Sequence, residues 1–168
     1  GNVIGEKYVG GLTGCILSNT NMTITLLNNF CNGNVTGSGK NAGGFVGYSS
    51  SNTNMTMMIS RCVNNGIITG GEFFSGGFVG FISGRKNTTV TISNSINNGN
   101  VTGRSFVGGL VGQVDSFNKD DSILFTVINS ANKGTVSVKS YLGCGLFCVS
   151  PEDYNMNTTV LNSINKGD

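Results

Sequence analysis

Apolar and polar positions follow the same order five times along this chain, and each round takes about 33 residues. A glycine-rich apolar phrase marks every round, at 10–14, 43–47, 76–80, 108–112 and, with cysteines at both ends, 144–148. A second phrase, in which an apolar residue stands three positions before a glycine, keeps step at 30–33, 63–66, 96–99, 131–134 and 164–167. Repetition at this period predicts a solenoid, in which each unit buries its apolar edge against its neighbours.

The opening glycines divide the chain into units 1–32, 33–65, 66–98, 99–133 and 134–166 of a single domain, 1–168. Both ends of the sequence fall at the same phase of the repeat. We therefore expect a segment of a longer array, or a subunit that assembles with others.

Three stretches of each unit have the composition of β-strands, because β-branched residues recur at fixed positions between glycines. The first stretch carries the apolar column Val3, Val35, Ile68, Val101 and Val136. The second carries Leu12, Phe45, Phe78, Leu110 and Leu146. The third carries two apolar columns two residues apart, which begin at Ile24 and Leu26. Period-2 alternation predicts that these columns face the interior.

Helix is disfavoured, because glycine and β-branched residues are poor helix formers and no helical stripe survives the glycine spacing. Three short strands per unit at constant register predict an all-β fold, a parallel β-helix of five coils with about 33 residues per coil. Each strand would pair with its equivalent in the next coil, about 4.8 Å away. Two columns of asparagine, which begin at Asn28 and Asn64, are expected to bond along the stack and at the corners.

The composition argues against several classes of partner. The net charge is +2, and the chain has no His and no Trp. Without a basic patch or a long apolar run, we expect neither nucleic-acid binding nor a membrane span. The eight acidic residues do not form a pair on the strands, so we expect no enzyme, no catalytic residues, no metal site and no cofactor. They are Glu6, Glu72, Asp115, Asp120, Asp121, Glu152, Asp153 and Asp168.

The Gly-Gly-(Leu/Phe)-Val-Gly phrase resembles the GLUG motif, a short repeat of large extracellular proteins, adhesins among them. Leu12, Phe45, Phe78, Leu110 and Leu146 match its apolar position, whereas Cys148 departs from its final glycine. The resemblance implies a secreted or cell-surface solenoid whose repeats serve as a scaffold or contact surface. Some bacterial immunoglobulin proteases look similar in this part, but their zinc chemistry is not implied for a chain without His.

Six Asn-X-Thr sequons mark candidate sites of N-glycosylation, provided that the chain passes through a eukaryotic secretory pathway. They begin at Asn21, Asn34, Asn54, Asn87, Asn100 and Asn157. An Asn- and Thr-rich repeat also copies any chance sequon into each unit. Coils only about 4.8 Å apart would crowd stacked glycans, so we expect partial occupancy.

Five cysteines leave at least one unpaired, or joined to another molecule. Cys144 and Cys148 can pair if the strand bends between them. Cys31 and Cys62 are offset by two residues in adjacent coils, which places them at the limit of disulfide geometry. Cys15 is expected to face outward. The alternative is that these cysteines are small apolar fillers.

Alternation also predicts an apolar outer face on the second strand, with Val46, Tyr48, Val79, Phe81, Val111 and Phe147. Such a face marks an interface unless a loop of the chain covers it. We therefore expect a non-enzymatic, extracellular structural protein, either a glycosylated segment of a surface adhesin or a filament subunit. It would self-associate, or pack on neighbouring repeats, through its solenoid ends and this face. The alternative function is a carbohydrate-binding or carbohydrate-processing β-helix module.

Overall fold

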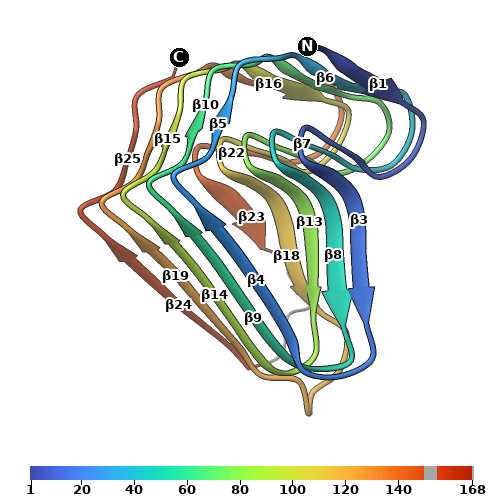
Figure 1. Cartoon of the computed structure of the whole chain (residues 1–168), viewed down its shortest axis with the longest axis vertical. Helices are drawn as coiled ribbons and strands as arrows, with labels where there is room; N and C mark the ends of the chain where they lie inside the picture. Colours follow the sequence, from blue (N-terminus) through green and yellow to red (C-terminus); the bar gives the residue numbers. More distant parts are fainter. Residues whose placement is uncertain (150–154, 168) are drawn as a thin grey trace.

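The chain forms a stack of parallel strands in a computed structural model that describes residues 1–149 and 155–167. Every regular element in these residues is a β-strand, and every strand pair is parallel. The 25 strands form five sheets, each with one strand from each of five coils. Equivalent strands of successive coils lie side by side, as β4, β9, β14, β19 and β24 do in Figure 1. The predicted β-solenoid is therefore confirmed.

The first three sheets follow one another along each coil. The first sheet contains β1 (Val3–Gly5), β6 (Val35–Gly37), β11 (Ile68–Gly70), β16 (Val101–Gly103) and β21 (Val136–Val138). The second contains β2 (Val9–Gly10), β7 (Ala42–Gly43), β12 (Ser75–Gly76), β17 (Val107–Gly108) and β22 (Gly143–Cys144). The third contains β3 (Thr13–Ser18), β8 (Val46–Ser51), β13 (Val79–Gly84), β18 (Val111–Ser116) and β23 (Phe147–Val149).

Two further sheets complete each coil. The fourth sheet contains β4 (Met22–Leu27), β9 (Thr53–Ser60), β14 (Lys86–Ser93), β19 (Ile123–Ile128) and β24 (Met156–Leu161). The fifth contains β5 (Phe30–Cys31), β10 (Val63–Asn64), β15 (Ile96–Asn97), β20 (Ala131–Asn132) and β25 (Ile164–Asn165). The three strands expected in each coil correspond to the first, third and fourth sheets. The two-residue strands of the second and fifth sheets carry the two recurring phrases.

The apolar columns build two cores rather than one. The larger core lies between the third and fourth sheets, where Phe45, Phe78, Met57 and Phe125 are completely buried. The smaller core lies between the first and second sheets, around Val35 and the residues that pack with it: Val9, Ala42, Ile68, Val101 and Val107. Buried apolar area stabilises the fold at about 25 cal/mol per Å². Each coil contributes to both cores, so removal of one coil would expose two apolar surfaces.

The predicted alternation of the second strand is wrong at its first residue. Val46, Val79 and Val111 were expected outside, but all three are completely buried in the larger core. The coil bends at the residue before them, since the N–H groups of Phe45 and Val46 both donate to the carbonyl of Phe78, at 2.9 and 3.0 Å. A corner residue and the first strand residue can therefore both point inward. Phe147 is also directed inward, with its ring 4.6 Å from that of Phe125.

The final glycine of the apolar phrase allows two strands to approach backbone to backbone. A Cβ added at Gly47 would lie 2.5 Å from the carbonyl carbon of Tyr8 and 2.6 Å from the nitrogen of Val9. Gly80 stands in the same relation to Ala42, at 2.9 Å from its nitrogen. Because Gly47 and Gly80 lack a side chain, the strands of the second sheet can pack directly against those of the third.

Candidate functional site

A ladder of buried asparagines runs along the fifth sheet. Asn64 Nδ2 donates to Asn97 Oδ1, and Asn97 Nδ2 donates to Asn132 Oδ1, each at 2.7 Å. Asn132 continues the ladder to Asn165, also at 2.7 Å. Each of the first three asparagines also donates to the carbonyl of the glycine two residues later, at 2.7–2.9 Å. The ladder thus satisfies polar groups that burial would otherwise leave unpaired.

This ladder packs against the second glycine of the apolar phrase, so the two recurring phrases meet in space. A Cβ added at Gly77 would lie 2.5 Å from Cγ of Asn97, and one at Gly109 would overlap Asn132. In the first coil Cys31 takes the ladder position and lies opposite Gly11. The buried asparagine column that begins at Asn64 and the glycine column opposite it therefore form one structural unit.

The other asparagine column occupies left-handed corners after the fourth sheet. Asn28, Arg61, Asn94, Asn129 and Asn162 have φ between 47° and 56°. Asparagine tolerates this conformation better than other non-glycine residues. Arg61 is therefore the strained member of the column.

All six sequon asparagines are exposed. Three of them form an outer ladder, in which Asn54 Nδ2 donates to Asn21 Oδ1 at 2.9 Å and Asn87 Nδ2 donates to Asn54 Oδ1 at 3.1 Å. These three also have positive φ, between 53° and 57°, which is a conformational reason for asparagine there. In another column the Oδ1 atoms of Asn34 and Asn100 accept from backbone N–H groups of the following coil, at 2.9 Å.

Cys144 and Cys148 form a disulfide across the bend between β22 and β23, with their Cα atoms 5.5 Å apart. This is the pairing that a bend was predicted to allow. Cys31 and Cys62 are buried, separate thiols, and Cys15 is an exposed thiol on the outer side of β3. Partial burial raises the pKa of both the Cys15 and Cys31 thiols; for Cys31 a backbone hydrogen bond with Gly33 partly opposes the shift.

The outer side of the third sheet carries an aromatic row instead of the valines. Tyr48 stacks between Tyr8 and Phe81, with ring centroids 5.1 and 5.5 Å apart, and Phe74 lies over Phe81 at 4.3 Å. Phe81 is consequently only 7 % exposed. Residues of the preceding loops thus cover much of the face that was predicted to be an open interface.

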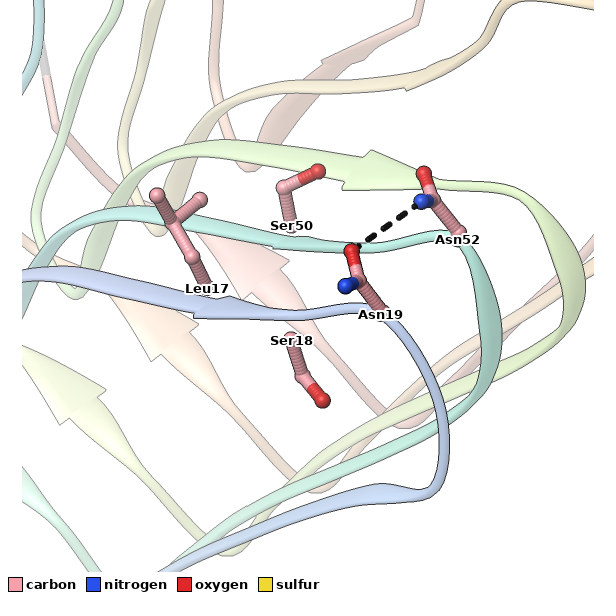
Figure 2. A pocket seen from close by; sticks show the side chains of 5 residues that line it. All are labelled: Leu17, Ser18, Asn19, Ser50 and Asn52. Atoms are coloured by element: carbon pink, nitrogen blue, oxygen red, sulfur yellow. Dashed lines mark hydrogen bonds between the residues drawn. The ribbon is translucent and has the colours of Figure 1, made fainter.

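Two hollows differ in what lines them. The larger, about 390 Å³, lies at the turn between the third and fourth sheets and is lined by Leu17, Ser18, Asn19, Ser50 and Asn52. Figure 2 shows Asn52 donating to Asn19 across it, at 3.4 Å. It has no titratable side chain, so it offers no acid–base chemistry. The smaller, about 150 Å³, lies in the aromatic row, between Tyr8, Tyr48, Phe74 and Phe81, with Lys40 and Asn41.

The described acidic residues do not converge. Asp121 is buried and caps its own loop, where its Oδ2 accepts from the backbone N–H of Asn118 at 2.8 Å. Glu152, Asp153 and Asp168 lie outside the described residues. Within the described part of the chain no cluster of His, Cys, Asp and Glu could hold a metal ion. Residues 1–149 and 155–167 also contain no helix long and apolar enough to cross a membrane.

Comparisons with family models, with curated proteins and with solved structures found no match to this chain. The geometry therefore has to carry any functional argument. Sequence reasoning missed the small aromatic hollow. Its signal is the column Tyr8, Asn41, Phe74 and Phe106, in which one polar residue interrupts the aromatic rings.

Proposed function

We propose that this chain is a non-enzymatic structural solenoid of the cell exterior, either a glycosylated segment of a surface adhesin or the subunit of a filament. In either case further coils, from the same chain or from another copy, stack on the coils described above. The supporting observation is that all five sheets continue in parallel through the five coils, with a register shift between β18 and β23, so an added coil could pair with the outermost strand of each sheet. Open strand edges of this kind are templates for pairing.

The chemistry of the outermost coils supports stacking of this kind. Leu12 belongs to the inward column of Phe45 and Phe78, yet it is 51 % exposed, since the described coils cover it on one side only. Phe30, which pairs with Val63, is 66 % exposed. At the other end Val160, which continues an inward column, is 44 % exposed. A coil that repeats the same columns would cover these side chains.

An extracellular location is supported by the disulfide and by the sequons. Structural disulfides persist in oxidising compartments. Because all six sequon asparagines are exposed, glycans attached to them would not disturb the core. The amide nitrogens of Asn54 and Asn87 are engaged in the outer ladder. Asn34 and Asn100 use only their oxygens and lie two coils apart, so we expect these two to be glycosylated more fully than Asn54 and Asn87.

The assembly is tested by light scattering and electron microscopy of the purified protein over a range of concentrations. Leu12→Lys places a charge on the coil edge, whereas the matched control Leu17→Lys places one on an outward position that is 67 % exposed. We expect rods whose length grows with concentration, shortened by L12K and unaffected by L17K. A protein that stays monomeric throughout excludes the filament and leaves the adhesin segment.

Glycosylation is tested on protein secreted from a eukaryotic host. The intact mass before and after glycosidase treatment gives the number of glycans, and peptide mapping assigns them to sequons. Absence of any glycosidase-sensitive mass would contradict the glycoprotein part of the proposal. Full occupancy of Asn54 and Asn87 would contradict the expected ranking.

A further inference from the structure

The small hollow exists because one residue in an aromatic column is short. The residues that precede the second sheet in the first four coils are Tyr8, Asn41, Phe74 and Phe106. The ring of Phe74 contacts that of Phe106, at 5.3 Å, and fills its own level of the row. Asn41 has no ring, so a space of about 150 Å³ remains at its level, between Tyr8 and Phe74.

The side chain of Asn41 is buried and unpartnered. It is 4 % exposed, and no side-chain hydrogen bond links it to the described residues, but its polar atoms are not among the fully enclosed ones that lack a partner, which belong to Ser75, Thr88 and Gln113. Only its backbone carbonyl is engaged, as acceptor from Val9 N–H at 2.8 Å. The Asn41 amide therefore offers the hollow a donor and an acceptor that no protein group uses, which suits a polar ligand.

The other walls are apolar and rigid. Tyr48 is held by Tyr8 on one side and by Phe81 on the other, and Phe74 is held by Phe81 and Phe106. Lys40 is the single charged residue of the lining, and it is exposed at the rim. A ligand with apolar C–H groups, several hydroxyls and a negative charge would match the aromatic walls, the amide and the ammonium group.

We propose that this hollow binds one pyranose ring of a glycan and favours a ring that carries a carboxylate. The volume is that of about five water molecules, at about 30 Å³ each, which suits one substituted six-membered ring rather than a drug-sized ligand. Asn41 exchanges hydrogen bonds with the hydroxyls, the aromatic residues contact the C–H groups, and Lys40 pairs with the carboxylate. This site is independent of the coil stacking proposed above.

The test uses glucuronate and glucose as probes. The chain has four Tyr and no Trp, and two of the four line the hollow, so tyrosine fluorescence reports on binding. Asn41→Phe fills the space with the residue that the third coil already has in this column, so the fold tolerates it. We expect saturable binding, tighter for glucuronate, and a loss of at least about 30-fold in affinity in N41F, the size of a hot-spot substitution.

A pair of lysine variants tests the rim. Lys40→Met should weaken glucuronate binding several-fold and leave glucose binding unchanged, whereas Lys86→Met, an exposed lysine of β14, should change neither. Circular dichroism and thermal unfolding check that each variant is folded. Absence of saturable binding of both sugars, or equal binding by N41F and the unmodified protein, would overturn the proposal. Equal affinity for the two sugars would overturn the role given to Lys40.

Discussion

Asn97 donates a 2.7 Å hydrogen bond from Nδ2 to Oδ1 of Asn132, its equivalent in the next coil. Both side chains are completely buried, and their carboxamides lie against Gly77 and Gly109. The two motifs that repeat along the sequence therefore pack together as one unit, in which stacked asparagine amides fill the space left by stacked glycines. Loss of either stack should lower the stability of the whole solenoid.

Replacement of Asn97 by Ala should lower the free energy of unfolding by about 3 kcal/mol or more. The change leaves Asn64 Nδ2 and Asn132 Oδ1 without a partner in the ladder, and each buried unsatisfied group costs about 1–3 kcal/mol. Urea denaturation measures the effect. The control is Asn98→Ala, whose exposed side chain bonds Asn65 in the outer row and should matter by less than about 0.5 kcal/mol. Similar losses in both variants would contradict the role of the buried ladder.

Gly77→Ala should lower the melting temperature by more than a typical glycine substitution. Its Cβ would overlap the carboxamide of Asn97 and the backbone of Gly109. Gly37→Ala is the matched control, because the nearest atoms, Ala42 Cβ and Val9 Cγ2, are 3.4 Å away. We expect G37A to be neutral, or more stable by up to about 1 kcal/mol through lower entropy of the unfolded chain. Equal melting temperatures for the two variants would refute the packing argument.

Arg61→Asn should stabilise the protein by about 0.5–1 kcal/mol. Arg61 adopts φ 53° in a column where the other four residues are asparagine, which suits this conformation better. Thermal unfolding detects the shift. Arg85→Asn removes the same charge at an exposed position with negative φ, so it should leave the stability unchanged. A gain in both variants would point to charge rather than backbone conformation.

Thiol labelling should distinguish three kinds of cysteine. In the native protein only Cys15 should react quickly; unfolding without reductant should expose three thiols, and reduction should expose all five. Because burial raises the pKa of Cys15, less of it is thiolate at a given pH than in a free thiol, and its labelling rate should rise at higher pH. Labelling of more than three thiols without reductant would contradict the disulfide.

Much of the fold could be predicted because the five units of the sequence can be aligned with one another. The columns of Val35 and Phe45 are buried as expected, since a residue that recurs at the same phase meets the same surroundings in each coil. The same logic anticipated the bonding between stacked asparagines. Whether the chain is glycosylated, extracellular or self-associating remains a prediction, because these properties depend on partners and compartment.

The sequence by itself determined the coil length, the register and the residues that share a column, because these follow from periodicity alone. Only the tertiary structure decided how the coil bends. The double acceptor at Phe78 turns Val46 inward, and the close approach at Gly47 places a second sheet on the outside of the third. A bend changes which face a side chain takes without changing its place in the repeat, so no pattern of residues could reveal it.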